Sequence, residues 1–292
     1  MIQLLNHVKG LVRSVMRKDG TMKTTKATIP IITLLSDFGL RDAYVAEMKA
    51  AILSISPDVC IVDISHEIEK FNIRMGAFIL ASATPYFPKG TVHVAVVDPG
   101  VGTKRRPIII QTKRSFYVGP DNGLLLLSAR KEEVSHVYHI KNPEYMCPKI
   151  STTFHGRDIF APAAAYLVRG CSPSRFGSEI QDYVIPQFAQ PYMKKGEIVG
   201  EVMYIDNFGN VVTNISSKDH EELETSIGDL LHVRIGRKTF GMRFCSAYGE
   251  VPARTLLAIV GSHDFLEISI NQGNASKTLN LRIGASFSIR FR

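Results

Sequence analysis

The sequence predicts an α/β domain followed by an antiparallel β-domain, which is either a small barrel or a sandwich. Two observations lead to this fold class. In the first half of the chain, β-branched runs alternate with stretches whose apolar residues recur at helical spacing. Such β-α-β alternation is typical of a mostly parallel sheet between helices. In the second half, short alternating runs are separated by Gly, Asn and Asp turns, as in antiparallel β-domains.

The first domain is expected to open with a buried strand over residues 31–35. A helix over 44–55, a second strand over 60–64, a helix over 73–83 and a third strand over 91–97 follow from the spacing of the apolar residues. Each crossover in this alternation is expected to be right-handed. The three strands are therefore predicted to lie parallel in one sheet.

Beyond the third strand, the chain is predicted to form a hairpin from residues 107–111 and 115–118. A helix opens at Leu124, and polar, irregular sequence follows it. An alanine-rich helix is then expected over 159–168, with Gly170 as its C-cap.

The domain boundaries follow from a break in composition, where Pro, Gln and a Lys-Lys-Gly turn replace the periodic pattern. We expect an α/β domain over 31–185, a linker over 186–196 and a β-domain over 197–292. Residues 1–30 carry six Lys or Arg against one acid and are predicted to be a poorly ordered extension. This extension lacks the features of a secretory signal, whereas an organelle-targeting peptide remains an alternative.

Composition excludes several classes of protein. The net charge of +8 arises partly from the basic extension, and aromatic-interleaved basic patches are absent, so no nucleic-acid binding is inferred. No apolar run approaches the ~20 residues of a membrane span. The cysteines form no CxxC pair, which argues against a zinc ribbon or a disulfide framework and favours a reducing cytoplasm. They are Cys60, Cys147, Cys171 and Cys245.

An acidic residue follows each of the first three predicted strands. These are Asp37, Asp63 and Asp98. Each alone would usually be a helix cap or a turn former. Because the carboxyl ends of parallel strands meet at one edge of a sheet, where ligands bind in open α/β folds, the three carboxylates together indicate a site there.

The stretch after Asp98 is a glycine-broken turn that leads to Arg105 and Arg106. It is either a ligand-binding loop or a tight turn capped by an aspartate beside two solvated arginines. His155 lies in a loop just before a helix N-terminus, whose dipole favours an anion nearby. A loop histidine is commonly a surface residue, but this setting also suits a functional one.

Six motifs, in chain order over residues 31–292, resemble those of the S-adenosyl-L-methionine (SAM) hydrolase family. This family is also called SAM hydroxide adenosyltransferase and is related to fluorinase and chlorinase. The motifs are Ser36-Asp37-Phe38-Gly39, Val97-Asp98-Pro99-Gly100-Val101-Gly102-Thr103, Pro120-Asp121-Asn122-Gly123, Thr153-Phe154-His155-Gly156-Arg157-Asp158, Asp206-Asn207-Phe208-Gly209-Asn210 and Asn271-Gln272-Gly273-Asn274-Ala275.

The resemblance implies an N-terminal α/β domain and a C-terminal β-barrel. It implies a homotrimer with active sites between neighbouring subunits. The implied reaction is displacement of methionine from the ribose C5′ by water, giving adenosine and L-methionine. Neither a metal nor a cofactor is implied, and SAM itself is the substrate.

Carried over to this sequence, the catalytic residues of the family fall on Asp98, Arg105 and His155, and the ribose-binding residue falls on Asp37. The substrate contacts of the second domain fall on Asp206, Phe208, Asn210, Ser262 and Ala275. The segment 261–265 matches the family less cleanly than the other motifs.

Two departures from the halogenases are visible. Asp98 stands where the fluorinase motif has a tyrosine, and Gly156 stands where it has a serine that helps to hold the halide. A carboxylate at the halide position repels an anion, so halogenation is disfavoured.

The residue types suit hydrolysis of a sulfonium. The sulfonium leaves as a neutral thioether and needs no general acid, so the task is to place and activate one water behind C5′. Asp98 can accept a proton from this water, while Arg105 and His155 can donate to the developing hydroxide. The alternatives are a halide-using adenosyltransferase and a non-catalytic SAM or adenosine sensor. A metal enzyme is least favoured, because no ligand cluster has metal spacing.

Overall fold

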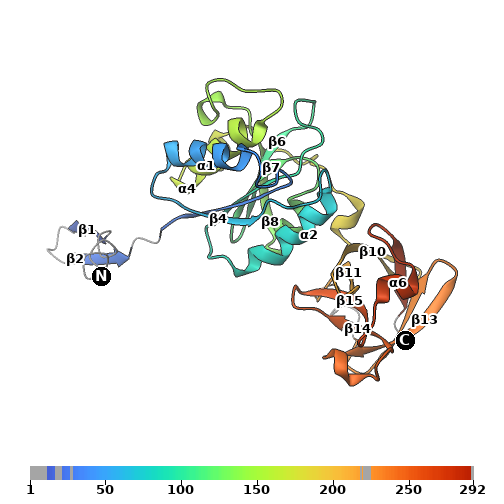
Figure 1. The fold of residues 1–292 in the computed structure, drawn as a ribbon. Helices are drawn as coiled ribbons and strands as arrows, with labels where there is room; N and C mark the ends of the chain where they lie inside the picture. The colour runs from blue at the N-terminus through green and yellow to red at the C-terminus, as the bar shows by residue number, and fades with distance from the viewer. Residues whose placement is uncertain (1–11, 17–21, 27–28, 218, 220–224, 291–292) are drawn as a thin grey trace.

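The protein consists of an α/β body and a β-barrel body joined near residue 190 (Figure 1). The structure is a computed structural model that describes residues 12–16, 22–26, 29–217, 219 and 225–290. Its α/β body is drawn in blue to yellow-green and its barrel in golden yellow to red. None of the described helices is long and apolar enough to cross a membrane.

The sheet of the α/β body has six strands in the order β4-β3-β5-β7-β6-β8. Neighbours among β4, β3, β5 and β7 are parallel, whereas β6 is antiparallel to both β7 and β8. This confirms the mostly parallel sheet and the hairpin. The strands are β3 (Ile31–Ser36), β4 (Cys60–Ser65), β5 (Val92–Val96), β6 (Pro107–Thr112), β7 (Phe116–Pro120) and β8 (Val134–His139).

Helices cover both faces of this sheet because successive strand residues point to opposite sides. Val94 and Val96 of β5 face a core that contains α1 and α4, while Ala95 faces a second core with α2 and α3. The helices are α1 (Tyr44–Ile55), α2 (Ile73–Ala83), α3 (Leu126–Lys131) and α4 (Ala161–Val168), and the short η1 (Thr84–Tyr86), η2 (Pro143–Tyr145) and η4 (Pro173–Arg175) connect elements.

Two local elements differ from the sequence prediction. Strand β8 lies in the stretch expected to be irregular; it is an edge strand with several exposed side chains, so its apolar signal is weak. The helix expected over 159–168 begins earlier, with a π-helical turn, η3 (Gly156–Phe160), that runs directly into α4. The π turn holds one residue more than an α turn, so its apolar residues do not recur at the spacing from which the helix start was predicted.

The second body is a closed barrel, which decides between the barrel and the sandwich. Seven strands run in the order β11-β15-β14-β13-β12-β16-β10, and β10 pairs with β11 to close the ring. All neighbours are antiparallel except β13 and β14. The strands are β10 (Glu197–Ile205), β11 (Val211–Ser216), β12 (Leu230–Ile235), β13 (Lys238–Cys245), β14 (Leu256–Val260), β15 (Phe265–Ile270) and β16 (Ser286–Arg290), with α6 (Ala275–Leu279) and η6 (Tyr248–Glu250) in the connections.

The segment expected to be a linker, 186–196, contains η5 (Gln187–Ala189) and β9 (Tyr192–Lys194), and β9 pairs with β10. The expected extension over 1–30 contains an antiparallel pair, β1 (Val12–Met16) and β2 (Met22–Lys26). Residues 1–11, 17–21 and 27–28 of that extension lie outside the described residues.

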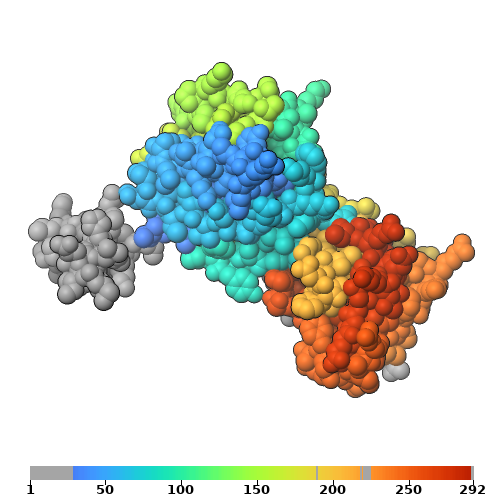
Figure 2. All heavy atoms as spheres, viewed as in Figure 1, coloured from blue at the N-terminus to red at the C-terminus, as the bar shows by residue number. Residues whose placement is uncertain are grey.

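The two bodies form separate lobes (Figure 2), and α2 contacts β10 of the barrel. Phe78 of α2 stacks on Tyr204 of β10, with ring centroids 5.0 Å apart, and both pack in a cluster with Phe265. Arg74 and Glu201 form an ion pair of 2.8 Å beside this cluster. Helix α2 is therefore shared between the core of the sheet and the contact with the barrel.

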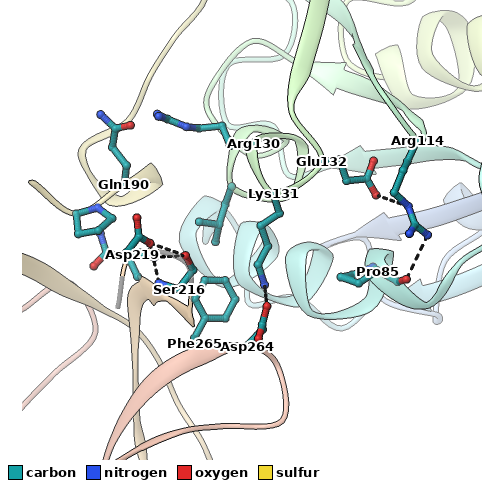
Figure 3. A pocket seen from close by; sticks show the side chains of 13 residues that line it. Pro85, Arg114, Arg130, Lys131, Glu132, Gln190, Ser216, Asp219, Asp264 and Phe265 are labelled. Atoms are coloured by element: carbon teal, nitrogen blue, oxygen red, sulfur yellow. Dashed lines mark hydrogen bonds and ion pairs between the residues drawn. The ribbon is translucent and has the colours of Figure 1, made fainter. Parts of the chain in front are cut away.

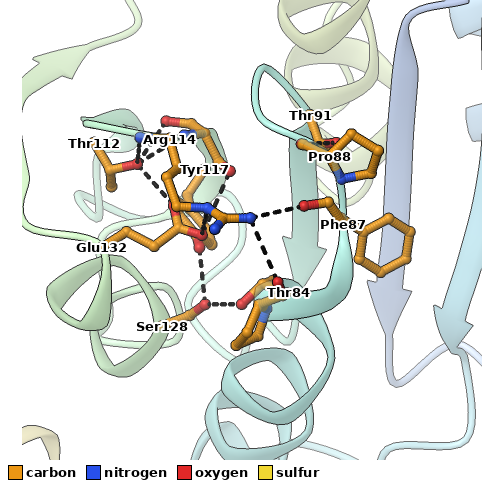
Figure 4. A network of polar contacts seen from close by, with 11 residues as sticks. Thr84, Phe87, Pro88, Thr91, Thr112, Arg114, Tyr117, Ser128 and Glu132 are labelled. Atoms are coloured by element: carbon orange, nitrogen blue, oxygen red, sulfur yellow. Dashed lines mark hydrogen bonds and ion pairs between the residues drawn. The ribbon is translucent and has the colours of Figure 1, made fainter.

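A buried polar network occupies the end of the sheet where β5 and β7 begin (Figure 4). Ser128 donates to the Tyr117 hydroxyl at 3.0 Å and lies 2.5 Å from the Thr84 hydroxyl. The Tyr117 ring lies 5.0 Å from the His93 ring. Burial raises the pKa of Tyr117 and lowers that of His93 to about 3, with the charge of Arg114 as a second cause for His93. Both side chains are therefore neutral at ordinary pH.

His93 is expected to make the fold sensitive to acid. Its pKa in the folded state is about 3, against about 6.5 in the unfolded chain, so only the unfolded state binds the proton as the pH falls below 6.5. The unfolding free energy should fall by about 2 kcal/mol between pH 7.5 and pH 5 from this residue alone. Urea unfolding of the wild type and His93→Asn at both pH values measures this. Equal pH dependence in the two proteins would contradict it.

Candidate active site

Asp98, Arg105 and His155 lie in direct contact. Arg105 Nε donates to both carboxylate oxygens of Asp98 at 2.9 Å, and Arg105 Nη2 contacts Asp98 Oδ2 as well. The same Nη2 lies 2.9 Å from His155 Nδ1. The three residues proposed from the sequence to act on water are thus neighbours, although His155 is far from the other two in the chain.

The arginine determines which ring nitrogen of His155 carries a proton. A guanidinium is only a donor, so Nδ1 of His155 must accept, and a neutral ring then carries its hydrogen on Nε2. Burial, followed by the positive charge of Arg105, lowers the pKa of His155 below its usual value. His155 is therefore a neutral donor through Nε2 at ordinary pH. Arg105 Nη1 is buried and has no hydrogen-bond partner among the described residues.

The loop that follows β5 brings Asp98 and Arg105 to His155 through one glycine. Gly102 has a φ of +73°, and a Cβ atom there would lie 2.2 Å from the carbonyl oxygen of Thr152. Only a residue without a side chain allows the loop over 98–105 to approach the loop over 151–155 this closely. Gly102 therefore permits the close approach of two loops of this chain.

The loop carrying His155 is tied down by Asp158. The buried carboxylate of Asp158 accepts from the backbone N–H of Ser151 at 2.7 Å and from Arg157 Nε at 2.7 Å. Arg157 also donates to Glu47 of α1 at 2.7 Å. These contacts fix the chain on both sides of His155, so the imidazole is held by its surroundings as well as by Arg105.

A pocket of about 210 Å³ opens beside the trio. Asp98 and His155 line it, and so does Asp37, the residue expected to bind ribose hydroxyls. Three aromatic rings, those of Phe38, Tyr44 and Phe154, form one wall with centroids 5.0 to 5.7 Å apart. Arg105 lies behind Asp98 and is not part of the lining.

Asp37 is held by the backbone of the neighbouring connection. Its Oδ2 accepts from the N–H of Phe71 at 2.9 Å, and the carboxyl is largely buried. Phe71 has a φ of +65°, which is rare for an aromatic residue, and its side chain is 67% exposed at the rim of the pocket. Asp63, in contrast, does not line this pocket, and it pairs with Lys49 at 2.6 Å. Only two of the three strand-end carboxylates converge.

A second pocket, of about 690 Å³, lies on the barrel. Asp206, Phe208 and Asn210 line it together, as the motif suggested. The Asp206 carboxylate accepts from the backbone N–H groups of Phe208 and Asn210 at 2.9 and 2.8 Å and from Asn210 Nδ2 at 2.9 Å. Asp206 thereby fixes the turn, while the Phe208 ring is 79% exposed.

Ser262 and Ala275 lie outside both pockets. Ser262 is in the exposed turn between β14 and β15, and its carbonyl accepts from the Tyr86 hydroxyl at 3.2 Å. Ala275 is fully buried in the barrel core, while its neighbour Asn274 lines the barrel pocket. The α/β pocket and the barrel pocket share no lining residue. One chain therefore carries the two groups of expected site residues in separate places.

Several lining residues escaped the sequence prediction. Tyr44 lies at the first turn of α1, the helix predicted over 44–55, and it lines the pocket directly after the Asp37 loop. A tyrosine at the start of a helix that follows a predicted site loop is a sequence signal for a pocket-lining residue. Phe71 lies in a connection and Tyr248 in the single turn η6, and neither segment has a periodic pattern that could have predicted them.

A third pocket, of about 510 Å³, lies between the end of α3 and the barrel (Figure 3). Lys131 Nζ lies 4.1 Å from the centroid of the Phe265 ring and 4.0 Å from Asp264 Oδ2, which joins the two bodies. No residue of the expected active site lines it. Among the described residues, no group of three or more His, Cys, Asp or Glu side chains is arranged to hold a metal ion.

Comparisons with known proteins agree on one family. Residues 32–177 match the model of the SAM hydroxide adenosyltransferase N-terminal domain, and residues 200–288 match that of the C-terminal domain. The chain is 39% identical to "(R)-S-adenosyl-L-methionine hydrolase" of Methanocaldococcus jannaschii, over 87% of this chain and 93% of that protein. A protein of the same name from Thermus thermophilus is 36% identical, over 87% and 96%.

More distant and structural matches extend the comparison. A fluorinase of Nocardia brasiliensis is 28% identical over 92% of this chain and 99% of that protein. The crystal structure of an uncharacterized conserved protein from Thermotoga maritima superimposes with a TM-score of 0.77 at 40% identity, covering 89% of this chain and all of that one. The similarity therefore spans both bodies.

Proposed function

The chain belongs to the SAM hydroxide adenosyltransferase family, and from this membership we propose that it hydrolyses SAM to adenosine and L-methionine. The observation that carries the proposal is the contact of Asp98, Arg105 and His155 beside a pocket that also contains Asp37. Relatives that match over most of their length are named for the same reaction.

The trio suits activation of a single water. Asp98 accepts a hydrogen from the water and the Nε2–H of His155 donates to its oxygen, while Arg105, behind Asp98, holds both side chains and stabilises the developing hydroxide by its charge. The water then attacks C5′ in line with the C5′–S bond. The bond to sulfur breaks, its electron pair stays on sulfur, and methionine leaves as a neutral thioether. The proton released by the water passes to Asp98 and on to solvent.

Binding roles follow from the chemistry of the remaining residues. A carboxylate that accepts from two hydroxyls fits the ribose diol, which is the role of Asp37. Asn210 offers one donor and one acceptor to an edge of adenine, and the exposed Phe208 ring stacks on the base. Asp206 acts by holding this turn. Ala275 contributes through the turn before it, whose Asn274 lines the barrel pocket. Ser262 lines neither pocket and is given no binding role within one chain.

No metal or cofactor is needed in this proposal, because the leaving group departs without protonation and the nucleophile is activated by side chains. Addition of a chelator should leave the activity unchanged.

We also propose a location in the reducing cytoplasm, which the four free cysteines support.

The direct test is incubation of the protein with SAM in water labelled with heavy oxygen. Because the relatives are named for (R)-SAM, the two sulfonium epimers are offered separately. Label in the adenosine 5′-hydroxyl, with release of methionine, is the expected result. Adenosine without label would exclude attack of water at C5′. Retained SAM without methionine release would indicate a binding protein instead.

Halide transfer is the second candidate, because fluorinases are among the relatives. Asp98 opposes it, since a carboxylate repels a halide ion. Incubation with SAM and chloride, followed by a search for 5′-chloro-5′-deoxyadenosine, separates the two reactions.

We propose that the protein is a homotrimer and that each active site joins the α/β pocket of one subunit to the barrel pocket of the next. Two observations support this proposal. The two pockets share no lining residue within one chain. Large apolar side chains line both pockets and are exposed, among them Tyr44 and Phe71 on the α/β body and Phe208 on the barrel.

This arrangement predicts complementation between inactive subunits. Asp98→Asn disables the α/β half of a site and Asn210→Ala weakens the barrel half, so each homotrimer should turn over SAM poorly. Trimers formed by co-expression contain some sites built from two intact halves, and activity should rise several-fold above either parent. Light scattering on the purified proteins reports the subunit number. Activity equal to the average of the parents would contradict shared sites.

A further inference from the structure

A buried histidine joins the loop that carries Asp37 to the neighbouring strand end. Ser36 Oγ lies 2.7 Å from His66 Nδ1, and both side chains are buried. The backbone N–H of Gly39 donates to the His66 carbonyl at 2.7 Å, and the N–H of Ile68 donates to the Ser36 carbonyl at 3.4 Å. The ends of β3 and β4 are thus joined by three contacts, and Asp37 lies in the middle of the joined segment.

The hydrogen bonds of this cluster have one consistent direction. The N–H of Phe38 donates to Ser36 Oγ at 3.4 Å. The carboxylate of Asp63, which only accepts, faces Nε2 of His66, so Nδ1 accepts from the Ser36 hydroxyl. The His66 ring then carries its hydrogen on Nε2. This nitrogen lies 3.2 Å from Asp63 Oδ1 without forming a directed hydrogen bond, and Asp63 in turn pairs with Lys49 of α1.

Serine, histidine and aspartate in contact resemble a hydrolytic triad, but the burial excludes that role. Ser36 is 0% exposed, so no substrate carbonyl can reach its hydroxyl. The next residue, Asp37, does line the α/β pocket. The cluster therefore acts on the pocket only through the position of its neighbour.

We propose that His66 is a positioning residue that, through Ser36, holds the Asp37 carboxylate where it accepts both hydroxyls of a ribose. The connection after β4 supplies the second support, since the N–H of Phe71 binds Asp37 Oδ2. With both supports, the carboxylate is oriented before a ligand arrives, and the ligand does not have to order it. The inference rests on the proposed function, because it assigns the ribose diol to Asp37.

The same strand provides a matched control. Thr33, three residues before Ser36 on β3, pairs with the buried His93 at 2.8 Å. Neither residue of this second histidine–hydroxyl pair lines the α/β pocket, and His93 packs against Tyr117 near the start of β5 and β7. Substitutions of His93 therefore report the general effect of losing a buried histidine from this sheet.

The test measures how well the protein distinguishes adenosine from 2′,3′-dideoxyadenosine by calorimetry. The variants are Ser36→Ala, His66→Leu, His66→Asn, His93→Leu and Asp37→Ala. Ser36→Ala and His66→Leu should weaken the binding of adenosine about tenfold, which is the scale of losing one hydrogen bond that supports a charged group. The binding of the dideoxy compound should change less than about twofold. The KM for SAM should rise by the same factor as the dissociation constant of adenosine, with a smaller change in kcat.

His66→Asn keeps an acceptor near the position of Nδ1 and should restore most of the discrimination, whereas His93→Leu should leave it at the wild-type value. Ser36→Ala removes a single oxygen, so it still tests the proposal if His66→Leu does not fold. Unchanged discrimination in Ser36→Ala and His66→Leu overturns the proposal, and so does an equal loss in His93→Leu. A wild type that binds adenosine selectively but does not hydrolyse SAM refutes the proposed function and leaves this inference standing.

Discussion

Asp98→Asn is expected to lower turnover of SAM about 100-fold or more while the affinity for adenosine changes less than about tenfold. The amide keeps an acceptor for Arg105 but cannot take a proton from water, and loss of an acid–base group has an effect of this size. His155→Ala should produce a similar loss, because the ring donates to the same water. Since the two residues act on one step, the double variant should be little worse than either single one.

A neighbouring ion pair provides the control for this prediction. Arg106 binds Asp121 through Nε and Nη2 at 2.9 and 2.7 Å, and Asp121 is as buried as Asp98. Asp121→Asn therefore perturbs a similar arginine–carboxylate pair one residue away, without touching the trio. Turnover should stay within a few-fold of the wild type in this variant. Wild-type turnover in Asp98→Asn, or an equal loss in Asp121→Asn, would remove Asp98 from the mechanism.

Gly102→Ala is expected to damage both the fold and the reaction. A methyl group at this position meets the Thr152 carbonyl at 2.2 Å, and the backbone φ of +73° is itself unfavourable for alanine. Together these effects should lower the unfolding free energy by about 2 to 4 kcal/mol. Because the two loops must separate, His155 moves away from Arg105, and a displacement near 1 Å can reduce turnover about 100-fold.

Gly90→Ala is the matched substitution. Gly90 has a φ of +90°, but a Cβ atom there has nothing within 4 Å. It therefore carries the backbone penalty of about 1 kcal/mol without the collision. Chemical denaturation and steady-state kinetics of both variants separate the two effects. Equal behaviour of the two alanine variants would show that the contact between the loops is unimportant.

The sequence was informative where one physical rule determined the outcome. Apolar runs of the right period predicted the parallel strands and the helices that cover them. The rule that parallel strands end at one edge brought Asp37 and Asp98 to one pocket. It was wrong for Asp63, because the rule describes strand ends and takes no account of the direction of each side chain. Asp63 turns to Lys49 and His66 instead.

What the sequence could not supply were contacts between distant segments. The meeting of His155 with Arg105 depends on the absence of a side chain at Gly102 and on the buried Asp158, and neither has a periodic signature. Barrel closure depends on the pairing of β10 with β11, which is interrupted by an irregularity between Val202 and Tyr204. Alternating apolar residues suit a sandwich as well as a barrel, so the pattern left that choice open.

The π-helical turn after His155 makes the length of this segment as important as its composition. Across Gly156–Phe160 the N–H of Ala161 reaches back five residues to the carbonyl of Gly156. Deleting one residue here would let the turn close as an ordinary α-helix, which rotates everything before it by about 100° around the helix axis. His155 would then leave Arg105 although no site residue had been substituted. Deletion of one residue between His155 and α4 is therefore expected to abolish turnover, because it displaces His155.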